Sequence, residues 1–296
     1  MGIGLSETAW RLYVAPKGRI GNHLQGAALK VIETQRVKRL IRNSGQLVLV
    51  HSPGKVGSSA IYQSLVDSAL SNNAVIFQTH TIRSPSDPRT IAERHGLSPR
   101  RTDYTSEYLH KLVADGSLFG WEVKLISAVR DPIQRLISDF FQNLDRYTPD
   151  KKYPRDGQYS VEEYLEFFLG GVDLFRHSDW YEEQFRDLFG LDLYGTPFDK
   201  NTGFQIVKSP RMTAGVVRYD LMNEAAPRLF EIMFNHRLNL SRANDSSDKV
   251  YADAYRAFKK DLKFDEATLN RIYSLEHVQH FFSEGERLAA IEKWRQ

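Results

Sequence analysis

Residues 46–61, QLVLVHSPGKVGSSAI, constrain the fold of this chain more than any other stretch. Four apolar residues at 47–50 predict a buried strand, and a helical pattern begins at Ser58. After the strand the chain carries a proline, two glycines, a lysine and then the two serines that open the helix. A strand, a tight loop and a helix bind phosphate because the loop and the helix N-terminus point backbone N–H groups at the anion. The stretch therefore predicts an α/β protein with a phosphate site after its first strand.

Apolar strands alternate with helices through the first half of the chain. Strands are predicted at 46–51, 73–81 and 123–132, and helices at 58–69, 106–115 and 133–144. This alternation predicts a three-layer, P-loop-type parallel sheet flanked by helices. Ligands bind beyond the carboxyl ends of such strands. The loop at 52–59, the strand end from Gln78 to His80 and the strand end at Arg130 should meet at that edge.

The rest of the chain is predicted to complete the same domain, which we place at 45–296. After Asp150 the pattern is mostly helical, with two more strands at 203–210 and 214–221 that form a hairpin or join the sheet. Residues 1–44 are predicted to be an N-terminal helical extension.

The extension carries basic residues at helical spacing, namely Arg36, Lys38, Arg39 and Arg42. Two interpretations are open: a solvated amphipathic helix packed on the main domain, or a helix that docks on a partner or an anionic membrane surface. We expect a cytoplasmic protein, and the second interpretation would place it at the inner membrane surface.

Composition excludes several classes of site. The net charge of +3 suits an anionic ligand, but it is too small to indicate nucleic acid, which we do not expect as a partner. The chain has no cysteine, so disulfide scaffolds, thiolate zinc sites and cysteine nucleophiles are excluded. No apolar stretch approaches the roughly 20 residues of a membrane span.

The lysine of the loop stands in an unusual place for a nucleoside triphosphate site. Lys55 precedes Gly57 by two residues, and Gly57 is followed by Ser58, so the pattern G-x-x-x-x-G-K-[ST] is absent. The sequence disfavours a P-loop kinase, which remains an alternative. A glycine turn that binds nothing is a further alternative.

Two motifs together resemble the sulfotransferases that use 3′-phosphoadenosine 5′-phosphosulfate. SPGKVGSSAIYQSL resembles their 5′-phosphosulfate loop, and AVRDPIQRLISDFFQN resembles their 3′-phosphate motif, with Arg130 ending a strand and Ser138 following in the helix. A phosphate between these two could take guanidinium donors and a hydroxyl. Gly54 is a departure, because Pro and Lys are usually adjacent in the family loop.

The C-terminal half extends the resemblance to the bacterial sulfotransferase-like capsular polysaccharide synthesis proteins, so that it covers about 45–296. It implies transfer of a sulfuryl group, without a metal, to a hydroxyl of a saccharide or glycoconjugate. Lys55 would stabilise the bridging oxygen, and Arg130 with Ser138 would hold the 3′-phosphate. The other nucleotide-binding positions implied are Val56, Gly57, Ser58, Ser59 and Ala60.

A general base must accept the proton of the acceptor, and histidine has the pKa best suited to this at neutral pH. His80, at the end of the second strand, is our candidate, although it could be only a hydrogen-bonded loop residue. His51 is expected to be a structural donor, and Glu183 and His177 are reserve candidates.

The sequence leaves open the roles of four further residues and whether the protein is an enzyme. Trp180 and Tyr181 could stack on a sugar, although core packing is the favoured interpretation. Lys249 and Tyr251 could close over the nucleotide. A protein that binds the nucleotide without catalysing transfer is the alternative to an enzyme.

Overall fold

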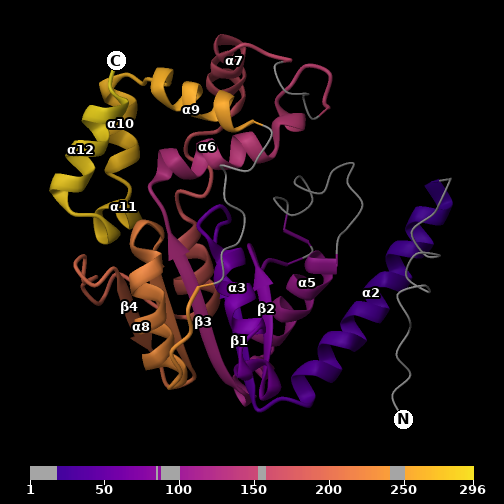
Figure 1. The fold of residues 1–296 in the computed structure, drawn as a ribbon. Helices are drawn as coiled ribbons and strands as arrows, with labels where there is room; N and C mark the ends of the chain where they lie inside the picture. The colour runs from indigo at the N-terminus through magenta and orange to yellow at the C-terminus, as the bar shows by residue number, and fades with distance from the viewer. Residues whose placement is uncertain (1–18, 85, 88–100, 153–157, 241–250) are drawn as a thin grey trace. The chain divides into compact units, whose positions relative to one another are not determined.

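The computed structural model describes residues 19–84, 86–87, 101–152, 158–240 and 251–296 (Figure 1). The chain divides into two compact units. One comprises Met1–Ser44 and Ile82–Leu118, and the other comprises Gly45–Thr81 and Phe119–Gln296. The second unit contains the sheet and all the residues proposed above for nucleotide binding and catalysis.

In the first unit, helix α2 (Arg19–Arg42) packs against helix α5 (Arg101–Ala114). The Lys30 ammonium pairs with the Glu107 carboxylate at 2.7 Å, and the Thr105 hydroxyl donates to the Glu33 carboxylate at 3.2 Å. Residues 19–42 of the predicted extension are thus helical.

The second unit is built on a five-stranded sheet of order β2-β1-β3-β5-β4. Its strands are β1 (Gln46–His51), β2 (Ala74–Thr79), β3 (Glu122–Val129), β4 (Phe204–Lys208) and β5 (Met212–Arg218). The first four of that order are parallel, and β4 pairs antiparallel with β5 at one edge. The predicted α/β class and mainly parallel sheet are confirmed, and the two late strands are both a hairpin and members of the sheet.

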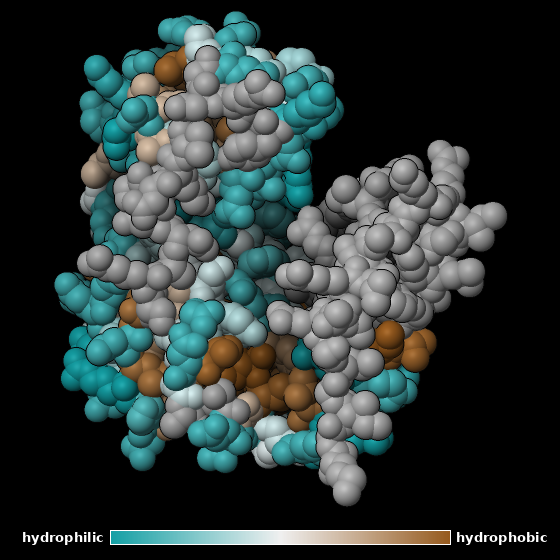
Figure 2. Space-filling model, turned by 45° about the vertical axis from the view of Figure 1, so that its right-hand side comes forward, coloured by the Kyte–Doolittle hydropathy of each residue, from teal (hydrophilic) through white to brown (hydrophobic). Residues whose placement is uncertain are grey.

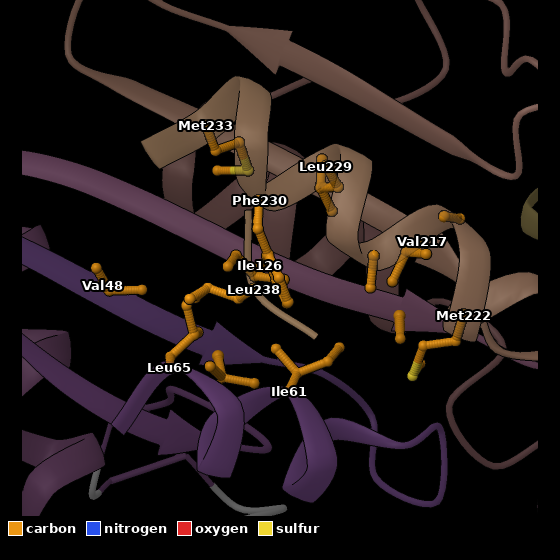
Figure 3. Packing of buried hydrophobic residues seen from close by; sticks show 14 of the residues in the cluster. Val48, Ile61, Leu65, Ile126, Val217, Met222, Leu229, Phe230, Met233 and Leu238 are labelled. Atoms are coloured by element: carbon orange, nitrogen blue, oxygen red, sulfur yellow. The ribbon is translucent and has the colours of Figure 1, made fainter. Parts of the chain in front are cut away.

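One face of the sheet is covered by α3 (Ser58–Val66) and α8 (Met222–Phe234). Figure 3 shows side chains of α3, α8 and the strands gathered in one apolar cluster. A Cβ at Gly215 of β5 would lie 2.6 Å from Met233 Sδ, so only glycine permits α8 to pack so closely. This packing fixes the position of α3 and hence of the loop before it.

The other face of β1 carries Leu47, Leu49 and His51, because side chains alternate along a strand. At its carboxyl end, the His51 ring lies 4.9 Å from the ring of Trp180, centroid to centroid. Trp180 and Tyr181 are buried, so the prediction that they pack in the core is confirmed. They precede a π-helix at Glu182–Asp187, a form often found near functional sites.

Helices complete the second unit. They are α6 (Pro132–Gln142), α7 (Val161–Gly171), α9 (Ala252–Asp261), α10 (Glu266–Tyr273), α11 (Glu276–Phe281) and α12 (Glu284–Trp294). Aromatic rings from α6, α7 and α9 pack on one another; Phe140, for example, lies 5.3 Å from Phe168 and 5.7 Å from Phe258, centroid to centroid. Figure 1 shows these three helices side by side. Pro132 begins α6 and Asp131 caps it, accepting from the Gln134 N–H at 2.8 Å.

Most of the described residues on the face shown in Figure 2 are hydrophilic, and hydrophobic residues gather in the lower part of that face; the mean hydropathy of the chain is −0.46. Among the described residues, we find no helix with the length and apolar character needed to traverse a lipid bilayer.

Candidate phosphate and transfer site

The loop after β1 adopts a conformation that most side chains avoid. Gly54 and Gly57 each have φ of 84°, and Lys55 between them has φ of 60°. A lysine in the left-handed region carries a backbone cost of about 1–3 kcal/mol, which persists only where the surroundings impose it. The strain at Lys55 is therefore a local reason to expect function at this loop.

Gly57 is required at its position for two reasons. Its positive φ favours glycine, and an added Cβ would lie 2.9 Å from both Cε and Sδ of Met222 and 3.1 Å from Tyr219 Cδ2. Gly57 is also the N-cap of α3, so the N–H groups of Ser58 and Ser59 stand at the start of a helix, where they lack intrahelical acceptors. This arrangement is suited to an anion.

The remaining loop positions differ in what they offer. The Val56 side chain is fully buried, so only its main chain could face a ligand. The Ala60 N–H already donates to the Gly57 carbonyl at 3.0 Å. The Ser58 hydroxyl accepts from Gln78 Nε2 at 3.0 Å, which ties the end of β2 to the start of α3.

Arg130, immediately after β3, reaches the loop directly. Its Nη1 donates to the Lys55 carbonyl at 3.1 Å, and its guanidinium carbon lies 4.2 Å from the centre of the Tyr219 ring. Asp131 makes no ion pair with it among the described residues; its carboxylate accepts from the Tyr273 hydroxyl at 2.7 Å. The Arg130 Nε is buried and has no partner in the described part of the chain. A buried donor of this kind suits an anionic ligand.

Ser138 lies two turns into α6 and is half-buried. One turn further on, Phe141 lies 5.4 Å from Tyr251 and 5.1 Å from Tyr255, ring centre to ring centre. Burial raises the pKa of Tyr255, and the charge of Arg130 and a hydrogen bond from it oppose that rise. Arg130 and the helix of Ser138 thus both adjoin the tyrosines of α9. Lys249 lies outside the described residues.

His80 stands beside the loop. Its Nδ1 bonds to the Ser52 carbonyl at 3.0 Å, and a Cβ on Gly54 would lie 3.8 Å from that nitrogen. A carbonyl can only accept, so Nδ1 carries the hydrogen, and in the neutral ring Nε2 carries the lone pair. The His80 ring is exposed. The structure therefore places the His80 ring next to Gly54 and fixes its neutral tautomer, in which Nε2 is the basic nitrogen.

His51 serves the structure, as expected. It is fully buried, with Nδ1 2.8 Å from the Thr79 hydroxyl and Nε2 3.1 Å from Gln184 Oε1. Burial lowers the pKa of His51 to about 3, so it stays neutral near pH 7. The reserve candidate Glu183 is half-buried on the π-helix.

A pocket adjoins the loop and the end of β3. It is lined by Pro53, Val56, Val129, Arg130, Pro132, Arg135, Leu174, Phe175, Arg176, His177, Ser178, Tyr181, Leu275 and His277. The reserve candidate His177 is thus close to the loop. Sequence reasoning missed Arg135, Arg176 and His277. Arg135 stands inside the quoted 3′-phosphate motif and could have been noticed, whereas no local pattern marks His277.

The fold and this geometry define an α/β protein with a strained, glycine-containing loop at the carboxyl edge of its parallel strands. Residues 166–283 match the NKWYS family, described as "Putative capsular polysaccharide synthesis protein". The resemblance to capsular polysaccharide synthesis proteins is therefore supported over these residues, which make up less than half of the chain and exclude the loop and Arg130. No curated protein and no solved structure matches the chain.

Proposed function

We propose that this protein is a sulfotransferase that moves a sulfuryl group from 3′-phosphoadenosine 5′-phosphosulfate to a hydroxyl of a saccharide. The observation that carries the proposal is the direct bond between Arg130 and the loop carbonyl of Lys55. It brings together two motifs that lie far apart in the sequence and resemble the two phosphate sites of one nucleotide. The family match adds the link to polysaccharide synthesis.

The residues present fit such a nucleotide. The N–H groups of Gly57, Ser58 and Ser59, at the start of α3, would hold the 5′-phosphate. Arg130, with its unpartnered buried Nε, and the Ser138 hydroxyl would hold the 3′-phosphate. When bound, the nucleotide supplies the activated sulfuryl group.

Lys55 would stabilise the charge that develops as the sulfur–oxygen bond to the 5′-phosphate breaks. The Lys55 backbone is held at φ 60° between two glycines, which fixes the direction in which its side chain leaves the loop. Fixed positive charge of this kind lowers the barrier because it needs no reorganisation during the reaction.

His80 would accept the proton of the acceptor hydroxyl. Ser52 holds the hydrogen on Nδ1, which leaves Nε2 as the basic nitrogen of the neutral ring. The acceptor oxygen then forms its bond to sulfur, the bond between sulfur and the 5′-phosphate oxygen breaks, and the proton resides on His80 Nε2.

Two other functions make different predictions. A nucleotide-binding protein without activity would bind adenosine 3′,5′-bisphosphate but transfer nothing. A P-loop kinase would prefer ATP with Mg²⁺, although the lysine position disfavours it.

The proposal is tested by supplying the purified protein with nucleotide labelled with ³⁵S and a panel of neutral and acidic oligosaccharides. A second reaction contains ATP labelled with ³²P at the γ position and Mg²⁺. We expect ³⁵S to appear on a saccharide and no ³²P transfer. Transfer of ³²P alone, or no transfer of either label with bisphosphate bound, would overturn the proposal.

A further inference from the structure

The pocket beside the loop brings together more positive charge than the nucleotide phosphates require. Arg130, Arg135 and Arg176 all line it. Arg135 donates from Nη2 to the Arg176 carbonyl at 2.9 Å, so the two arginines are tied together. The pocket also contacts the loop through Pro53 and Val56, which places it next to the proposed site of transfer.

These arginines lack the acidic partners that usually accompany a cluster of like charges. Among the described residues, none of the three makes an ion pair, and the acid that acts on Arg135 is Asp139, one helical turn away. Burial lowers the pKa of Arg135, with Arg176 and Arg130 acting in the same direction. An anion entering the pocket would relieve this repulsion.

His277 adds a different group to the same pocket. It is 7% exposed, and its Nδ1 is buried without a partner among the described residues. A backbone hydrogen bond at Ser178 raises the pKa, which identifies a ring N–H donating to a carbonyl. Burial and Arg135 outweigh it and lower the pKa of His277 to about 4. The ring is therefore neutral near pH 7, and Nδ1 is an acceptor that would pair with a hydroxyl donor.

We propose that this pocket binds an acidic sugar unit of the acceptor, with its carboxylate on Arg135 and Arg176 and a neighbouring hydroxyl donating to His277 Nδ1. This inference rests on the proposed function and names the substrate class: an acidic saccharide rather than a neutral one. A sugar acid carries both groups on one ring, which matches cationic donors and a neutral acceptor in one pocket.

The small size of the pocket suits the carboxylate group of a sugar acid. The pocket is partly open, and its volume is about 20 Å³, against the roughly 10–15 Å³ that one water needs. A flat carboxylate can enter edge-on and accept two parallel bonds from a guanidinium fork. The arginines would also offset repulsion between an acidic acceptor and the anionic nucleotide.

Calorimetry of saccharide binding tests this inference. The full chain is first saturated with adenosine 3′,5′-bisphosphate. The probes are a tetrasaccharide that contains glucuronate and the same tetrasaccharide with its carboxylates reduced to alcohols, so only the charge and one oxygen differ. We expect the acidic probe to bind at least about ten-fold more tightly, because the bonds involved are charge-assisted. In Arg176→Gln the preference should fall to about two-fold or less with bisphosphate affinity unchanged.

Arg186→Gln is the matched control, since Arg186 is exposed and lies outside the pocket. It should keep the full preference. His277→Leu should weaken both probes, because each retains hydroxyl groups. Equal binding of the two probes, or a preference that survives Arg176→Gln, would overturn the inference alone. If the unmodified protein did not bind the bisphosphate, the proposed function would be overturned instead.

Discussion

Arg130 donates a hydrogen bond from Nη1 to the main-chain oxygen of Lys55 across 3.1 Å. The end of β3 thereby holds the loop that follows β1, its parallel neighbour in the sheet. The Arg130 guanidinium thus fixes the conformation of the lysine loop, and in our proposal its buried Nε donates to an anion. In our proposal the hydrogen bond from Arg130 to Lys55 links the two phosphate sites, so a substitution at one site should also change phosphate binding at the other.

Lys55→Met should separate catalysis from nucleotide binding. Methionine keeps most of the aliphatic stem but removes the charge, and adenosine 3′,5′-bisphosphate lacks the sulfate that the ammonium group would face. We expect turnover to fall by about 10²–10³-fold, as when a fixed charge-stabilising donor is removed, with bisphosphate affinity reduced far less. Turnover is measured by ³⁵S transfer and affinity by calorimetry. Equal losses in both quantities would contradict the role given to Lys55.

His80→Ala should lower turnover by about 10²–10⁴-fold, the usual contribution of a general base. Glutamine is the structural control, because its amide N–H can also donate to the Ser52 carbonyl. His80→Gln should therefore keep the loop in place without restoring turnover. The acid limb of the pH–rate profile should disappear in both variants. Full turnover in His80→Ala would show that another group, such as His177, takes the proton.

Gly57→Ala should damage the loop through both its backbone and its neighbours. The φ of 84° is strained for alanine, and its Cβ would meet Met222 and Tyr219. We expect the free energy of unfolding to fall by about 1–3 kcal/mol and bisphosphate binding to weaken. Gly190→Ala is the matched control, with φ of 67° but nothing within 4 Å of the added Cβ. Urea unfolding of both variants checks this, and equal effects would contradict the tight packing described at Gly57.

Stability should fall as the pH is lowered from about 6.5, the ordinary pKa of histidine, towards 4. Burial lowers the pKa of His51 to about 3 and that of His277 and His280 to about 4. Below pH 6.5 these histidines therefore bind protons in the unfolded chain but remain neutral in the folded chain. Each residue adds up to about 1.4 kcal/mol per pH unit to the slope. Urea unfolding between pH 4 and 7.5 measures it. The slope should decrease in His51→Asn, and an unchanged slope would contradict the buried neutral state of His51.

The parts of the site that sequence could predict are those encoded by local patterns. The β1 bounds match the predicted strand 46–51, because an apolar run ends at a proline and glycine loop. The order of the parallel strands then forces the loop, His80 and Arg130 to one edge of the sheet.

What sequence could not predict depends on where distant segments return. His277 reaches the pocket from α11, and Arg176 from the segment before the π-helix. Both are placed by packing of the helical half of the unit, which no spacing rule describes. The positive φ of Lys55 was equally hidden, since it follows from contacts around the loop and not from the residue type.

Calorimetric binding of adenosine 3′,5′-bisphosphate, compared with ATP plus Mg²⁺, tests the central claim most directly. The account predicts that the bisphosphate binds without a metal and more tightly than Mg-ATP. It also predicts that Arg130→Gln loses at least about ten-fold in affinity, since charge-assisted bonds to a phosphate are removed. A preference for Mg-ATP, or bisphosphate binding that is unchanged in Arg130→Gln, would contradict it.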